Sequence, residues 1–219
     1  IDEDAIFDSI PAFEKYCTDN KFHTPGAKKI VLFTSVPGPF NANREHLDEI
    51  ITELQNRGYN VYPASTSGKR LEFIQQINPA LIVYMPHGRF GTGSPAAEFE
   101  RELVKLNVPV ICPVSILNQY EDWVKDPQGM SGGFLSQSIT MPEFDGGIIP
   151  YAAVAQYKDE NGLLIFKTIP DRLKNFSNII NNYISLKTLP NAEKKIAIFY
   201  YKGHGKGAGE AAGLEVIPS

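Results

Sequence analysis

The chain has 219 residues, 42% of them hydrophobic, and a formal net charge of −4. No apolar run approaches the roughly 18 residues of a membrane-spanning helix. The sequence pI of about 5.6 does not suit a nucleic-acid surface, because phosphate binding needs concentrated Lys and Arg. The composition therefore argues against a membrane span and a nucleic-acid interface, and we expect a cytoplasmic protein.

The first half of the chain predicts a doubly wound α/β core. Residues 1–26 are expected to form an N-terminal helical segment, and residues 27–115 alternate strand-like apolar runs with amphipathic helices. The four predicted strands are Lys28–Ser35, Tyr59–Ala64, Ala80–Pro86 and Val108–Pro113. This alternation is typical of a mostly parallel sheet with helices on both faces. We expect a flavodoxin-like fold.

Residues 116–219 are expected to continue this domain. The periodicity is lost from Val114 to Gly146, which predicts a long irregular loop of the functional kind. Two strands, Gly147–Lys158 and Leu163–Thr168, then flank a hairpin turn at Asp159.

An amphipathic helix is predicted to begin at Pro170, and a last strand to cover Lys195–Tyr201, which adds a strand-helix-strand segment to the core. The chain starts with Ile1 and stops shortly after a glycine-rich stretch. We therefore expect a piece of a longer polypeptide.

The third predicted strand ends in His87-Gly-Arg-Phe-Gly-Thr-Gly, at the edge where open α/β sheets bind ligands. The glycines would let backbone N–H groups approach an anion; they are Gly88, Gly91 and Gly93. The plainer interpretation is a tight strand-to-helix turn in which His87 only packs. The match to a dinucleotide fingerprint is poor, because it follows the third strand and no acidic residue ends the next one.

The second candidate site is Met141-Pro-Glu-Phe-Asp-Gly-Gly, which sets Glu143 and Asp145 one residue apart. In an extended segment alternate side chains share a face, so both carboxylates would point at one ligand. The plainer interpretation is a turn, since Asp bonds nearby backbone and glycine permits positive φ.

The remaining histidines and cysteines carry weaker signals. His204 lies in a glycine-rich loop and would be a metal ligand without a nearby second one. His23 and His46 are expected at the surface, and Cys17 and Cys112 as buried thiols.

Two enzyme classes lack their motifs. The loop Lys202–Glu210 is not a Walker motif, because Lys206 is followed by Gly, so the chain has no ATP-binding P-loop. A Ser-His-Asp hydrolase is not supported, because no G-x-S-x-G elbow is present.

Several motifs in one order resemble the CobN and magnesium-chelatase large-subunit family. The resemblance is best over Asn107–Gly213. The motifs that match are Val108-Pro-Val-Ile-Cys-Pro, Tyr120-Glu-Asp-Trp, Pro127-Gln-Gly-Met, Met141-Pro-Glu-Phe-Asp-Gly-Gly, Leu186-Lys-Thr-Leu-Pro-Asn-Ala-Glu-Lys-Lys-Ile-Ala and Ala211-Ala-Gly-Leu. The tail from Tyr200 lacks the proline-containing loop of typical members, which indicates a divergent branch.

The resemblance implies a tetrapyrrole substrate and a divalent metal substrate. Cobalt is the first candidate for this metal, and magnesium and iron are the alternatives. It also implies AAA-type ATPase partner subunits that hydrolyse ATP, in keeping with the absent P-loop. Under this hypothesis Glu143 and His87 act as base or metal-relay groups, Asp145 supports them, and Arg89 pairs with a carboxylate of the macrocycle.

These roles require His87 and the acidic segment to line a common cavity. The leading prediction is cobalt insertion into a corrin-type ring by the complete protein, with the isolated piece inactive. Two alternatives stay open. One is a dechelatase that removes metal from haem on the same scaffold, and the other is a non-catalytic module that binds a small anion.

Overall fold

The computed structural model describes residues 5–34, 44–65, 68–91, 96–130, 132–201 and 214–216. Two predicted site residues, Gly93 and His204, lie outside these ranges. By its internal contacts the chain forms two compact units, residues 1–184 and 185–219. The division at residues 27–115 and 116–219 stays a prediction.

The first unit contains a six-stranded sheet in the order β2-β1-β3-β4-β5-β6. The strands β1 to β5 pair in parallel, and β6 joins β5 antiparallel as the predicted hairpin. Their bounds are β1 Lys29–Phe33, β2 Asn60–Ala64, β3 Leu81–Tyr84, β4 Val110–Gln119, β5 Gly147–Lys158 and β6 Leu164–Thr168. The order 2-1-3-4-5 is that of flavodoxin-like folds, so the predicted fold class is confirmed.

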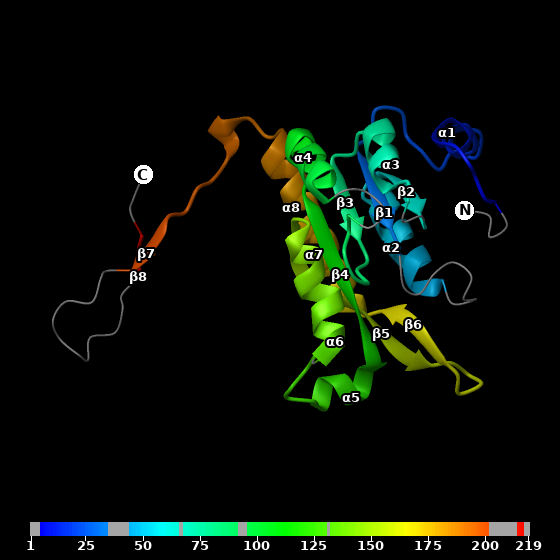
Figure 1. Ribbon diagram of the computed structural model, residues 1–219, viewed down its shortest axis with the longest axis vertical. Helices are drawn as coiled ribbons and strands as arrows, with labels where there is room; N and C mark the ends of the chain where they lie inside the picture. The colour runs from blue at the N-terminus through cyan, green and yellow to red at the C-terminus, as the bar shows by residue number, and fades with distance from the viewer. Residues whose placement is uncertain are drawn as a thin grey trace. The chain divides into compact units, whose positions relative to one another are not determined.

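Helices cover both faces of this sheet (Figure 1). Successive strand residues point to opposite faces, so Ile30 and Leu32 pack with α2 and α8, whereas Val31 and Phe33 pack with α1, α3 and α4. The helices are α1 Ile10–Asp19, α2 Glu45–Asn56, α3 Arg70–Ile77, α4 Ala96–Leu106, α5 Tyr120–Lys125, α6 Gly132–Leu135, the π-helical η1 Ser136–Thr140, α7 Met141–Phe144 and α8 Pro170–Thr188.

The segment predicted as a long irregular loop is mostly ordered secondary structure. Strand β4 continues to Gln119, and the short helical segments α5, α6, η1 and α7 follow before β5. Trp123, Phe134 and Ile139 from this segment pack against a third apolar cluster on β4 and β5. The helices are too short, and too often interrupted by glycine, to leave a clear helical period in the sequence.

The start of β5 is irregular. Ile148 and Tyr151 on β5 face Ile111 and Pro113 on β4, so β5 carries one extra residue there. Pro113 has no N–H to donate to the ladder, which suits a bulge. Ile149 within the bulge has φ 55°. A β-branched residue at positive φ is strained, and such strain clusters at functional sites.

The second unit contains the 3₁₀ turn η2 (Asn191–Glu193) and an antiparallel pair, β7 (Phe199–Tyr201) and β8 (Leu214–Val216). The last predicted strand is therefore shorter than expected at its N-terminal side. None of the described helices is both long and apolar enough to cross a membrane.

The two histidines expected at the surface are not there, and that expectation is wrong. His46 is 0% exposed on the inner side of α2, with its ring against Phe166. Burial lowers its pKa to about 4. His23 is half-buried against Phe13 and Tyr62, and burial lowers its pKa as well. The prediction of two buried free thiols, Cys17 and Cys112, is confirmed.

Candidate functional site

The structure brings together the two segments that the sequence singled out. The loop that leaves β3 and the segment that leads from α7 into β5 meet through an ion pair between Arg89 and Asp145. Nε of Arg89 donates to both carboxylate oxygens at 2.9 Å, and Nη2 donates to Oδ1 at 2.5 Å. The residues are 56 positions apart in the chain, so tertiary folding alone makes this contact.

Asp145 is the buried centre of this junction. Its side chain is 5% exposed against 43% for Arg89, and its Oδ2 also accepts the backbone N–H of Gly91 at 3.0 Å. Burial by itself raises the pKa of Asp145, but the hydrogen bonds from Arg89 and Gly91 outweigh it and leave that pKa below its ordinary value. The carboxylate is therefore charged and fully engaged within the chain.

A second set of contacts fixes the backbone of the same loop. Arg70, a buried cation at the start of α3, donates through Nη1 to the carbonyl of Phe90 at 2.8 Å. The hydroxyl of Tyr84 donates to the carbonyl of Gly88 at 3.2 Å, and the N–H of Gly88 donates to the carbonyl of Gln137 at 2.8 Å. Sequence reasoning missed Arg70, because nothing local marks a charged side chain that serves a distant loop.

The glycines of the loop serve its packing. Gly88 has φ 91°, a conformation that other residues rarely adopt. A Cβ on Gly91 would lie 3.3 Å from the ring of Phe99, so the backbone runs close to α4. The N–H groups of both glycines donate to groups of the chain itself, Gln137 and Asp145.

The two predicted reactive side chains lie at the surface on either side of this junction. His87 and Glu143 are both exposed, one at the start of the loop and the other within α7. Because α7 is helical, Glu143 and Asp145 do not alternate along an extended segment, and one faces solvent while the other is buried. That His87 and Glu143 line one cavity stays a prediction.

Close packing holds the acidic segment against the sheet. A Cβ on Gly147 would lie 2.8 Å from Sγ of Cys112 and 2.9 Å from the carbonyl oxygen of Pro142. Burial, aided by the negative charge of Glu143, raises the pKa of the Cys112 thiol to about 12. This thiol is therefore protonated and unreactive at neutral pH.

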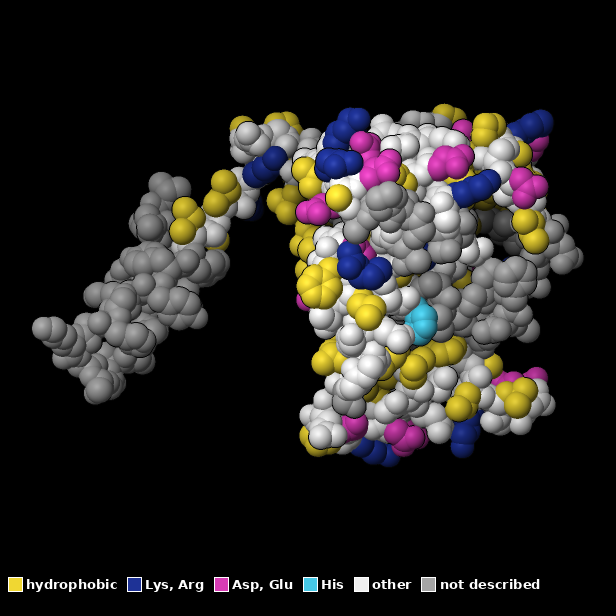
Figure 2. All heavy atoms as spheres, in the orientation of Figure 1, with side chains coloured by type: hydrophobic (Ala, Val, Ile, Leu, Met, Phe, Trp, Pro, Cys, Tyr) yellow, Lys and Arg dark blue, Asp and Glu magenta, His cyan; other side chains and the backbone are white. Residues whose placement is uncertain are grey.

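Large apolar side chains are exposed on β4, α6 and α7. Figure 2 shows hydrophobic side chains gathered in a band over α6 and the adjoining part of the sheet. Among the large exposed hydrophobic residues are Leu117 of β4, Leu135 of α6 and Phe144 of α7, and Arg89 lies over the ring of Phe144 at 5.8 Å. Within the described ranges no three His, Cys, Asp or Glu side chains form a group suited to hold a metal ion.

A family model described as CobN/Magnesium Chelatase matches residues 1–219. The chain is 25% identical over 133 residues to the aerobic cobaltochelatase subunit CobN of Pseudomonas aeruginosa, which covers 58% of this chain and 10% of that protein. It is 25% identical over 190 residues to a magnesium-chelatase subunit of Chlorobaculum parvum, which covers 79% of this chain and 14% of that protein.

The fold is similar to a solved structure, the catalytic subunit of cobaltochelatase from Mycobacterium tuberculosis. The TM-score is 0.62 at 18% identity, over 77% of this chain and 15% of that one. The chain spans between 8% and 17% of the length of the curated relatives that it matches.

Proposed function

The chain belongs to the CobN/magnesium-chelatase family, and we propose that it forms part of the tetrapyrrole-binding large subunit of a metal chelatase. The reaction we assign to the complete protein is insertion of cobalt into a corrin-type ring. AAA-type ATPase subunits supply ATP hydrolysis in this proposal, since the chain carries no P-loop. The location is the cytoplasm.

The observation that carries this proposal is the junction between the β3 loop and the acidic segment. It ties the loop that leaves the carboxyl end of β3, with an exposed histidine, to the segment that enters the amino end of β5, with an exposed carboxylate. The carboxyl ends of parallel strands are where such sheets bind ligands. The exposed ring of Phe144, over which Arg89 lies, adds apolar surface at the same place.

Metal insertion needs two kinds of protein group. Two pyrrole N–H protons must leave the ring, and the metal must lose bound water as the ring nitrogens replace it. Glu143 and His87 are the groups we assign to these tasks, because a carboxylate or a neutral imidazole accepts protons near neutral pH and binds divalent metals.

Arg89, Asp145, Gly88 and Gly91 serve the substrate through the position of the loop. The ion pair and the backbone bonds of the two glycines hold the loop that carries His87 against Asp145 and Gln137. Loss of this junction would separate the two reactive groups without removing either.

The test is metal insertion by the complete protein with its ATPase partners, followed by the absorbance change of the ring. Glu143→Gln removes the base and is expected to lower kcat at least ~100-fold while tetrapyrrole affinity stays within twofold. The matched control is Glu160→Gln, an exposed carboxylate in the hairpin turn, which should leave both quantities unchanged.

The outcomes separate the candidate functions. Full insertion activity in Glu143→Gln removes the role given to this residue. Metal loss from haem without ATP would instead favour a dechelatase. Binding of a small anion with no tetrapyrrole binding would favour the non-catalytic module.

A further inference from the structure

A cavity of about 680 Å³ lies away from the residues predicted as the site. It is partly open to solvent and is lined by α5, the turn that follows it and the start of α8. Ligand pockets of proteins measure roughly 300–1,000 Å³, so the space suits a small molecule. Its lining residues are Tyr120, Trp123, Val124, Asp126, Pro127, Gln128, Gly129, Ile169, Pro170, Asp171 and Arg172.

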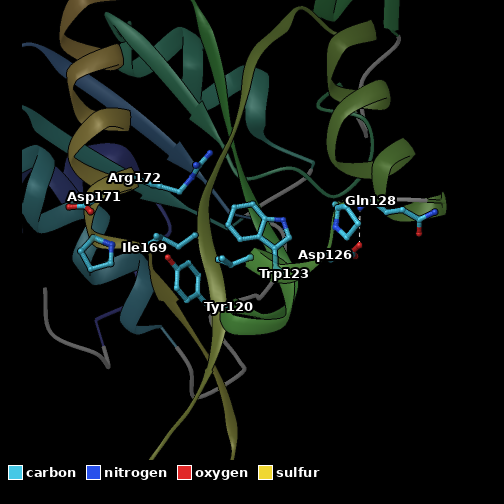
Figure 3. Close-up of a pocket in the computed structure, with 11 residues that line it drawn as sticks. Tyr120, Trp123, Asp126, Gln128, Ile169, Asp171 and Arg172 are labelled. Atoms are coloured by element: carbon cyan, nitrogen blue, oxygen red, sulfur yellow. Dashed lines mark hydrogen bonds between the residues drawn. The ribbon is translucent and has the colours of Figure 1, made fainter.

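The wall of this cavity is aromatic. Trp123, the single tryptophan of the chain, is half-buried there and lies 6.3 Å from the ring of Tyr120. Tyr120 in turn stacks on Tyr157 of β5 at 5.4 Å with an interplanar angle of 20°. In Figure 3 the indole lies between Tyr120 and Arg172 on one side and the turn of Asp126 and Gln128 on the other. A rigid wall of this kind stacks on flat rings.

One cation is fixed at the edge of this wall. Nε of Arg172 donates to the carbonyl of Ala152, and its guanidinium lies 5.6 Å from the ring of Trp123 and 4.5 Å from that of Tyr151. These contacts hold the side chain in one orientation before any ligand arrives. A held guanidinium is a preorganised partner for a carboxylate, because less side-chain freedom is lost on binding.

The two acids of the lining limit what fits. Oδ1 of Asp126 already accepts the N–H of Gln128 at 2.9 Å, as the dashed line in Figure 3 shows. Asp171 precedes Arg172 on α8, and neighbouring residues on a helix do not face each other. With two carboxylates against one guanidinium, a compact polyanion is disfavoured. A flat ring that places one carboxylate inside the cavity and any others in solvent can stack on the aromatic wall and pair with Arg172 without bringing excess negative charge near the two acids.

We propose that this cavity binds a flat conjugated ring against Trp123 and seats one carboxylate of that ring on Arg172. The identification of the ring as the tetrapyrrole rests on the proposed function. The cavity and the acidic segment share strand β5, because Arg172 bonds to Ala152, five residues or roughly 16 Å along the strand from Gly147. Helix η1, which leads directly into α7, also packs in the same apolar cluster as Trp123.

The test is binding of a metal-free porphyrin with two propionates, and of its dimethyl ester, to the complete protein by absorbance titration. Arg172→Met keeps the apolar stem and removes the charge, so it should weaken the acid at least tenfold and the ester less than twofold. Trp123→Leu should weaken both. Lys174→Met, which removes an exposed cation from the same helix, should change neither affinity.

A third probe separates this proposal from the proposed function. Pyrenecarboxylate is a flat aromatic carboxylate without ring nitrogens, and it should bind the wild type and lose affinity in Arg172→Met. Porphyrin binding that is equal in the wild type and in Arg172→Met would overturn the cavity proposal and leave the proposed function standing. If pyrenecarboxylate binding depends on Arg172 and the porphyrin does not bind, the cavity proposal is supported and the proposed function is contradicted.

If the wild type binds neither the porphyrin nor pyrenecarboxylate, both the cavity proposal and the proposed function are overturned. If Arg172→Met loses its near-ultraviolet circular dichroism, Arg172→Lys replaces it. Lysine keeps the charge but loses the fork of N–H groups that matches a carboxylate, so an acid affinity equal to that of the wild type would contradict the proposal.

Discussion

The junction at Asp145 and the cavity at Trp123 use charge in different ways. At the junction a buried carboxylate meets a guanidinium and a backbone N–H, and glycines admit close packing on both sides. At the cavity a guanidinium is held by one backbone carbonyl and two aromatic rings, beside about 680 Å³ of space. The first region joins two segments of the chain, and the second leaves room for another molecule.

The junction at Asp145 therefore serves to hold the fold, and the cavity at Trp123 is suited to binding a ligand. Removing one partner of a buried ion pair destabilises the fold, because the other partner loses its counter-charge, whereas a charged residue beside an open aromatic wall can recognise a solute. Substitutions should therefore change stability strongly at the junction and weakly at the cavity.

The largest effect is expected from Asp145→Ala. It leaves Arg89 without this carboxylate and the buried N–H of Gly91 without its acceptor, which should lower the free energy of unfolding by about 3 kcal/mol. Urea denaturation of the complete protein measures this. Asp122→Ala, an exposed acid on α5, should cost no more than about 0.5 kcal/mol. Equal losses for the two would show that the junction is not a stabilising centre.

Gly147→Ala tests the packing side of the junction. The added Cβ would meet Sγ of Cys112 and the carbonyl oxygen of Pro142, and backbone cannot give way as a flexible side chain does. We expect a loss of about 2 kcal/mol in the same assay. Gly133→Ala is the matched control, since it lies in α6 with no atom within 4 Å of its Cβ position, and it should be neutral or slightly stabilising.

The free energy of unfolding should also depend on pH below about pH 4, and this effect should be smaller than those of the two substitutions. Because the pKa of Asp145 is lowered in the folded state, its contribution is fully present above about pH 4, the ordinary value of an unfolded Asp. It is lost as the pH falls through the lowered folded pKa. The loss is smaller than in Asp145→Ala, because the protonated acid still accepts a hydrogen bond. Denaturation of the wild type and of Asp145→Asn between about pH 5 and pH 2 should give a steeper decline for the wild type, and parallel curves would contradict this.

The smallest effect is expected from Gln128→Ala at the cavity. This side chain is exposed in the turn after α5, so its loss should change the free energy of unfolding by less than about 0.5 kcal/mol. Differential scanning calorimetry would detect a shift in Tm. A loss above about 1 kcal/mol would mean that the cavity lining is part of the stabilising framework, and the contrast with the junction would disappear.

The prediction of the fold succeeded where the sequence pattern is long and regular. The buried strands Lys29–Phe33 and Leu81–Tyr84 are apolar almost throughout because helices cover both faces. The prediction failed at Tyr120–Phe144, where short helices carry too few turns to show a period. It also failed at His46, because its burial depends on β6, which lies more than 100 residues further along the chain.

The sequence by itself determined the alternation of strands and helices, the two buried thiols and the two segments that carry the candidate site. Local composition suffices for these, since each depends on neighbours within a few residues. Only the tertiary structure decided that Asp145 is engaged by Arg89 while Glu143 stays exposed, and that Trp123 and Arg172, 49 positions apart, share one cavity. The physical reason is that burial and charge pairing depend on which distant segments the sheet brings together.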